Sequence, residues 1–112
     1  MTGLSTHVLD TALGKPAAGV PIVLERWDGA AWDFVAKGET DSDGRLRTLM
    51  DGQSRHPGEY RISFNISLYS ARIGAKGFFP EVNIRFVVED TTEHFHVPLL
   101  WSPFGFSTYR GS

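Results

Sequence analysis

The sequence contains no cysteine among its 112 residues, which excludes disulfides, thiol nucleophiles and cysteine-ligated metal sites. It also lacks a strong charge bias, because 11 Lys and Arg stand against 13 Asp and Glu. Without a basic field, nucleic acid and anionic lipid are not expected as partners. No run approaches the roughly 20 apolar residues that span a bilayer, and residues 1–7 carry no basic and apolar signal segment. We therefore expect a cytoplasmic protein without a membrane partner.

The length fits one domain, which we expect to span residues 1–112. Alternating apolar and polar residues are typical of strands with one buried face. This pattern predicts strands over residues 5–10, 20–27, 32–37, 60–66 and 82–86, with Arg45 at the start of a further strand after the turn at 41–44. One short helix is predicted over residues 68–73, capped by Ser67 and ended by Gly74. Closely spaced strands with one helix indicate an all-β, two-sheet antiparallel sandwich.

The last 22 residues are unusually apolar for a chain end. Only Glu93 and Arg110 carry charge between Thr91 and Ser112, whereas Leu99, Leu100, Trp101, Phe104 and Phe106 accumulate there. A small sandwich needs one inward face per strand, so the surplus apolar area, with Phe78 and Phe79, is expected to meet another subunit. The alternative is one thick monomeric core.

Two histidines lie two positions apart in the segment 94–99. Strand alternation sends Phe95, Val97 and Leu99 to one side and both His94 and His96 to the other. Histidine suits proton transfer near neutral pH, and a pair can divide the base and acid roles. Two alternatives stay open: the histidines only decorate the strand surface, or they join His7 in a zinc site.

Further polar groups strengthen the histidine pattern. Alternation turns Arg45 away from the buried side taken by Leu46, and Arg110 offers a planar donor fork suited to imide or carboxylate groups. Ser112 would add a hydroxyl and the terminal carboxylate directly after the apolar run. Together these groups predict a polar cluster at an apolar interface.

Several segments carry a likeness to a known family across nearly the whole chain. They are residues 6–10, 14–21, 43–45, 78–82, 94–100 and 102–112. In these segments the sequence resembles the 5-hydroxyisourate hydrolases, the transthyretin-related enzymes of urate breakdown. The closing Tyr-Arg-Gly-Ser separates these hydrolases from the hormone-carrying transthyretins, which lack it.

The resemblance implies a transthyretin-like sandwich of two four-stranded sheets, assembled as a homotetramer that is a dimer of dimers. It implies hydrolysis of 5-hydroxyisourate to 2-oxo-4-hydroxy-4-carboxy-5-ureidoimidazoline, on the way to allantoin, with no metal or organic cofactor. The catalytic residues would be His7, Arg45, His96 and Ser112. The substrate-binding residues would be His94, Tyr109, Arg110 and Gly111. The rival function is a transthyretin-like carrier that holds a small ligand without catalysis.

Three residues depart from the family's usual pattern. Phe95 and Phe106 stand where tyrosine is common, and Trp101 stands where leucine is usual. The two phenylalanines make their surroundings less polar, and the bulk of Trp101 must be accommodated by its neighbours. Substrate fit or subunit packing is expected to differ accordingly.

Overall fold

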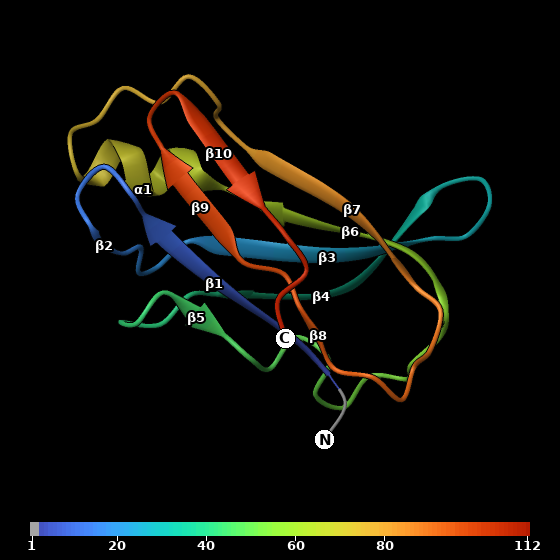
Figure 1. The fold of residues 1–112 in the computed structure, drawn as a ribbon. Helices are drawn as coiled ribbons and strands as arrows, with labels where there is room; N and C mark the ends of the chain where they lie inside the picture. Colours follow the sequence, from blue (N-terminus) through green and yellow to red (C-terminus); the bar gives the residue numbers. More distant parts are fainter. Residues whose placement is uncertain (1–2) are drawn as a thin grey trace.

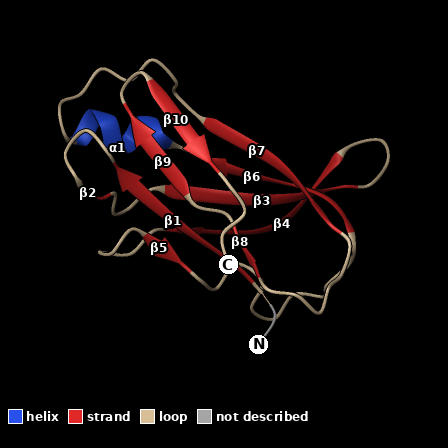
Figure 2. Cartoon of the chain, in the orientation of Figure 1, coloured by secondary structure: helices blue, strands red, loops and turns tan. Residues whose placement is uncertain are grey.

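The computed structural model describes residues 3–112, so the first two residues of the predicted domain lie outside the described part. Figure 1 shows two layers of strands with a short helix at one end, and Figure 2 shows how far strands dominate over helix. The predicted all-β sandwich is confirmed. In residues 3–112, no helix reaches the length and hydrophobicity needed to cross a bilayer.

The first sheet is built around the N-terminal strand. It has the order β10-β9-β1-β2, and β5 and β8 also pair with β1. Its strands are β1 (Leu4–Asp10), β2 (Lys15–Pro16), β5 (Arg45–Leu46), β8 (Phe95–His96), β9 (Leu99–Ser102) and β10 (Gly105–Thr108). Three of these segments have only two residues, so the sheet counts more strands than the four expected. β1 also runs parallel to β8 and β9, whereas the other pairings are antiparallel.

The second sheet has four long strands in the order β4-β3-β6-β7. They are β3 (Pro21–Trp27), β4 (Trp32–Glu39), β6 (Gly58–Phe64) and β7 (Val82–Val88). All of its pairings are antiparallel. The bounds of the four strands agree with the predicted ones to within a few residues. β3 and β4 form a hairpin, in which Trp27 lies opposite Trp32.

The helix α1 (Ile66–Arg72) begins two residues earlier than predicted. Asn65 occupies the N-cap position, so the prediction that Ser67 caps the helix is wrong. The Ser67 hydroxyl instead donates a hydrogen bond to Asn65 Oδ1. Gly74 does adopt the left-handed conformation, with φ of 73°, and its N–H donates to the Ala71 carbonyl. The predicted end of the helix is therefore confirmed.

The core lies between the two sheets. Its fully buried side chains include Val8 and Leu99 from the first sheet and Ile22, Leu24, Ile62 and Phe64 from the second. Asp10 is also buried: one carboxylate oxygen accepts from Tyr69 Oη at 2.7 Å, and the other accepts from the Ala12 and Leu13 amides. Burial and this hydrogen bond raise the pKa of Tyr69 to about 12, so the pair ties α1 to β1.

The apolar C-terminal segment divides between core and surface. Leu99 and Trp101 are buried, and Trp101 packs edge-on against Tyr69 with ring centroids 5.6 Å apart. Phe78 and Phe104 are 70% and 76% exposed, and Phe106 is 40% exposed. The expected surplus of apolar area is therefore present on the surface of a single chain.

Candidate functional site

Alternate residues of β1 point to the outer face of the first sheet. Leu4, Thr6 and Val8 are buried toward the core. Because side chains alternate along a strand, Ser5 and His7 point the other way. This outer face is where the structure gathers most of the predicted polar groups.

Arg45 reaches this face through the turn that precedes it. β5 pairs with β1 so that Arg45 lies opposite His7, and directly paired residues share one face of a sheet. The Gly44 carbonyl accepts from the Val8 amide at 2.7 Å, and Gly44 has a φ of 75°. A Cβ at Gly44 would lie 2.4 Å from the Val8 carbonyl oxygen, so only glycine fits there.

Asp41 holds the same turn from its other end. Its Oδ1 accepts hydrogen bonds from the amides of Asp43 and Arg45, at 2.8 and 3.0 Å. The amide of Arg45, followed by that of Asp43, lowers the pKa of the Asp41 carboxyl. The carboxylate therefore stays ionised and fixes the backbone of Arg45 beside His7.

His7 has a defined tautomer in its neutral form. Its Nε2 lies 2.9 Å from the Asp43 carbonyl oxygen, and a carbonyl can only accept a hydrogen bond. Nε2 therefore carries the proton and donates it, which leaves a lone pair on Nδ1. A neutral His7 can thus accept a proton at Nδ1.

The two histidines of the 94–99 segment point away from the core, as predicted. Phe95, Val97 and Leu99 are buried, while His94 is exposed and His96 is half-buried. Both imidazoles contact one hydroxyl: Ser5 Oγ lies 2.9 Å from His94 Nε2 and 2.8 Å from His96 Nδ1. The strand breaks between β8 and β9, where Pro98 has no N–H to donate to a neighbouring strand.

The surroundings of His96 favour its neutral form. Partial burial lowers its pKa below the ordinary 6.5, and the nearby charges of His7, His94 and Arg45 lower it further, although a hydrogen bond that His96 donates to Ser5 raises it. At neutral pH this imidazole is therefore ready to accept a proton. His7, Arg45, His94 and His96 form one cluster, called here the imidazole face.

Part of the C-terminus reaches the imidazole face. The Gly111 amide donates to the His96 carbonyl at 2.8 Å in an isolated antiparallel bridge, and Figure 1 shows the C-terminus beside β8 and the start of β1. A Cβ at Gly111 would lie 2.4 Å from Cδ2 of the His96 ring. Ser112 follows as an exposed residue. Gly111 therefore packs directly against the proposed base.

Tyr109 and Arg110 lie elsewhere in the single chain. Together with β7 residues such as Phe86 they line a hollow of about 230 Å³. The Arg110 guanidinium stands 4.7 Å from the centre of the Phe95 ring and 3.6 Å from Glu93. Since Phe95 points to the core side, these two side chains are not on the imidazole face of their own chain.

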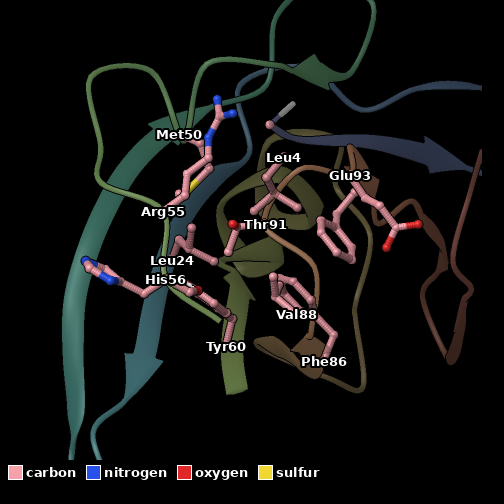
Figure 3. Close-up of a pocket in the computed structure, with 12 residues that line it drawn as sticks. Leu4, Leu24, Met50, Arg55, His56, Tyr60, Phe86, Val88, Thr91 and Glu93 are labelled. Atoms are coloured by element: carbon pink, nitrogen blue, oxygen red, sulfur yellow. Dashed lines mark hydrogen bonds between the residues drawn. The ribbon is translucent and has the colours of Figure 1, made fainter. Parts of the chain in front are cut away.

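An apolar cavity of about 30 Å³ lies between the sheets, away from the imidazole face. Figure 3 shows Leu24, Tyr60 and Val88 around it, with the His56 imidazole and Glu93 carboxylate pointing outward. Ligand pockets typically measure about 300–1,000 Å³. This cavity has room for only a water molecule or two, so a substrate or carried ligand would not fit it.

The zinc alternative finds no supporting geometry in a single chain. Among residues 3–112, no three His, Asp or Glu side chains converge closely enough to hold a metal ion. The inner nitrogens of His94 and His96 are directed at the Ser5 hydroxyl, and Nε2 of His7 is directed at a carbonyl. These contacts leave the three imidazoles without a common centre.

Ser5 was not among the predicted site residues. Its position two residues before His7 on the same strand was an available signal, because alternation puts both on one face. Its contact with His94 and His96 depends on the parallel pairing of β1 with β8, which brings together residues about 90 positions apart. No local sequence pattern reports that pairing.

Comparison with known proteins shows the family to which the sequence is similar. Residues 4–111 match the family described as "HIUase/Transthyretin family". A 5-hydroxyisourate hydrolase of Caulobacter vibrioides is 46% identical, with both chains covered completely. A 5-hydroxyisourate hydrolase of Salmonella dublin is 45% identical over 97% of this chain and 80% of its own length.

Solved structures agree with that match. The 5-hydroxyisourate hydrolase of Klebsiella pneumoniae superposes with a TM-score of 0.86 and 38% identity, covering both chains completely. Transthyretin from Sparus aurata gives a TM-score of 0.91 at 26% identity, covering 99% of this chain and 97% of its own. The backbone is thus shared by hydrolase and carrier, whereas the sequence is closer to these hydrolases.

Proposed function

The chain belongs to the HIUase/Transthyretin family, and from this premise we propose that its imidazole face is the active site of a 5-hydroxyisourate hydrolase. The enzyme hydrolyses 5-hydroxyisourate to 2-oxo-4-hydroxy-4-carboxy-5-ureidoimidazoline in the degradation of urate to allantoin. One observation carries the assignment of the site. The pairing of β1 with β5 and β8 places His7, Arg45 and His96 on one outer face of a single chain.

The proposed mechanism uses water as the nucleophile. A neutral imidazole, His96 through Nε2 or His7 through Nδ1, removes a proton from water as its oxygen attacks the lactam carbonyl carbon of the six-membered ring. The carbonyl oxygen becomes negatively charged, and the Arg45 guanidinium stabilises that charge. The carbon–nitrogen bond then breaks as the protonated imidazole returns its proton to the leaving nitrogen, and the carboxylic acid that forms releases its remaining proton to solvent to give the carboxylate.

Arg45 is suited to the oxyanion role because no carboxylate in the described part of the chain pairs with it. Among residues 3–112, the ion pairs are Arg61–Glu25, Arg85–Glu59 and Arg110–Glu93, and none involves Arg45. A guanidinium without a carboxylate keeps its full charge for an anionic group. In the absence of substrate its neighbour on the sheet is His7.

We propose that the active protein is a homotetramer, a dimer of dimers. The exposed Phe78, Phe104 and Phe106 support this, because contiguous apolar surface of this kind commonly marks a subunit interface. Assembly also lets Tyr109 and Arg110 contact the substrate of a neighbouring chain, whereas Ser112 follows Gly111 beside His96 of its own chain. Side chains that lie off the imidazole face of their own chain can complete the site of a neighbour, with His94 and Gly111 supplied by the chain that carries His96.

We also propose a single domain, a cytoplasmic location and a reaction without a cofactor. Residues 1–112 act as one hydrolase domain in the cytoplasm, where a chain without cysteine needs no oxidising environment. The reaction needs only water besides the substrate, because an imidazole base and a guanidinium supply the proton transfer and charge stabilisation. No cofactor is therefore proposed.

A carrier without catalysis is the second candidate, supported by the likeness to transthyretin. It is disfavoured by the imidazole face itself. A channel for an apolar ligand gains nothing from a guanidinium and three imidazoles, each of which loses hydration when a ligand covers it. The higher identity to the hydrolases points the same way.

The direct test supplies freshly generated 5-hydroxyisourate and follows the decay of its ultraviolet absorbance with and without the protein. We expect decay well above the spontaneous rate, unchanged by prior treatment with a chelator. Saturable binding of the substrate at the spontaneous decay rate would support the carrier. Loss of activity on chelation, restored by zinc, would support the metal alternative instead.

A further inference from the structure

The Ser5 hydroxyl sits between two imidazoles in a position that the backbone fixes. β1 and β8 pair in parallel with Ser5 opposite His96, and the Val97 amide donates to the Ser5 carbonyl at 2.9 Å. The Ser5 residue is only 8% exposed. Its Oγ therefore has little contact with water, and its hydrogen-bond partners are His94 Nε2 at 2.9 Å and His96 Nδ1 at 2.8 Å.

A hydroxyl has one proton, which restricts the protonation of its two neighbours. Ser5 can donate to only one imidazole nitrogen, so it must accept from the other. If Ser5 donates to His94, His96 carries its proton on Nδ1 and has a lone pair on Nε2. If Ser5 donates to His96, the proton of His96 sits on Nε2, and the outer nitrogen cannot act as a base. Only the first arrangement lets His96 act as the base.

The charges around His96 favour the first arrangement. Nδ1 is engaged with Ser5, so Nε2 is the ring nitrogen left for the imidazole face that it shares with Arg45. The positive charge of Arg45 attracts a lone pair and repels an N–H group. His94 is exposed, so in the same arrangement its Nδ1–H can donate to water. Each polar group of the trio then has a partner.

We infer that Ser5 is a positioning residue that keeps the Nε2 lone pair of His96 free, by accepting a hydrogen bond from His96 Nδ1 and donating one to His94. The inference rests on the proposed function for its catalytic consequence. It also gives His94 a defined task within its own chain. Ser5 itself does not touch the reacting atoms in this arrangement.

Ser5→Ala tests the inference, and Ser63→Ala is its matched control. Ser63 lies on the other sheet and is also 8% exposed, and its hydroxyl accepts a hydrogen bond from Asn83 on the adjacent strand β7. We expect Ser5→Ala to lower kcat about 10- to 100-fold, the usual cost of a hydrogen bond to an ionising group, with KM nearly unchanged. Ser5→Thr, which keeps the hydroxyl, should recover most of the rate, and Ser63→Ala should keep it.

NMR spectroscopy reports the tautomer of His96 independently of enzymatic activity. In wild-type protein with ¹⁵N-labelled histidine, nitrogen shifts should show His96 protonated at Nδ1, and in Ser5→Ala they should show a mixture of tautomers. Near-normal kcat in Ser5→Ala, or a wild-type His96 protonated at Nε2, would overturn the inference. A wild-type protein that fails to hydrolyse 5-hydroxyisourate yet shows the Nδ1 tautomer would refute the proposed function and leave the hydrogen-bond assignment standing.

His94 provides an independent check through a double-mutant cycle. Removing it with His94→Ala frees the Ser5 proton to turn toward His96 Nδ1, so the same tautomer is lost by another route. We expect the double variant to be no slower than the slower of the two single variants. Effects on kcat that multiply fully would contradict a shared hydrogen-bond chain.

Discussion

The two outer faces of the sandwich carry similar kinds of polar side chain in different states of pairing. On the β4-β3-β6-β7 sheet, Arg61 donates to Glu25 at 2.8 Å and stands 4.4 Å from the centre of the Trp32 ring, while Arg85 pairs with Glu59. On the imidazole face, Arg45 has no carboxylate partner among the described residues. On one face two guanidiniums are paired with carboxylates, whereas on the other a guanidinium lies beside imidazoles with no carboxylate partner among residues 3–112.

This difference separates structural charge from functional charge. A paired surface charge contributes little to stability and has little capacity left for a ligand. An unpaired guanidinium close to His96, whose pKa is lowered, is typical of a site that handles protons and anions. The comparison predicts that equivalent substitutions on the two faces differ sharply in their effect on catalysis.

The largest effect is expected at the proposed base. His96→Asn removes the proton acceptor and should lower kcat about 10²- to 10⁴-fold, because a positioned general base contributes that much. His56→Asn is the matched control, since His56 is exposed and lies off the imidazole face. The measurement is the steady-state rate with 5-hydroxyisourate, alongside thermal unfolding. Near-normal turnover of His96→Asn would remove His96 from the mechanism.

A methyl group at the C-terminus should also disturb the base. In Gly111→Ala the new Cβ would lie 2.4 Å from His96 Cδ2, so the ring or the terminus must move. A displacement of about 1 Å in a catalytic group can cost about 10²-fold in rate. Gly105→Ala is the control, because its nearest neighbour would be Ser102 Oγ at 4.0 Å. Equal rates for both variants would show that the terminus does not position His96.

A change of donor geometry at Arg45 should have a smaller effect. Arg45→Lys keeps the charge but loses the planar fork, so we expect kcat/KM to fall about tenfold. Arg85→Lys, the same change on the opposite face, should leave the kinetics unchanged. If Arg45→Lys retains wild-type kcat/KM, a positive charge alone is sufficient at this position.

The pH profile should reflect the charge of Arg45. A base must be deprotonated, so activity falls as the pH drops through its pKa, which burial and nearby positive charge set below 6.5 for His96. Arg45→Gln removes a positive charge that disfavours the imidazolium, so the pKa of His96 should rise. We expect the acidic limb of kcat/KM to move to higher pH in this variant. An unmoved limb would place Arg45 outside the electrostatic range of the base.

The smallest effect is expected at a paired charge. Glu25→Gln breaks the ion pair with Arg61 on the opposite face and should change the free energy of unfolding by about 1 kcal/mol or less. Its turnover should equal that of the wild type. A large loss of activity in this variant would show that the opposite face also takes part in catalysis.

The parts of this arrangement that the sequence predicted are those with a local pattern. The alternation of His94, Phe95, His96 and Val97 assigned each side chain to the correct face, and the Asp-Gly turn placed Arg45 at the start of its strand. The start of α1 was misplaced because Ser67 and Asn65 are both capable N-cap residues. Intrinsic preference could not choose between them.

The parts that the sequence could not predict depend on long-range pairing. The contact between Ser5 and His96 requires β1 to pair with β8, and the position of Arg110 over the Phe95 ring requires the last strand to fold back along β9. Such contacts join residues by topology and not by spacing. A resemblance to a family names the residues of a site without giving the register that brings them together.

The central claim is that substrate binds the imidazole face and not its paired counterpart. It is tested most directly by mapping amide and imidazole NMR shifts of the labelled protein as urate, a stable planar analogue of the substrate, is added. The account predicts saturable shifts at Ser5, His7, Arg45 and Gly111 and none at Glu25 or Arg61. Shifts confined to the face of Glu25 and Arg61 would contradict it.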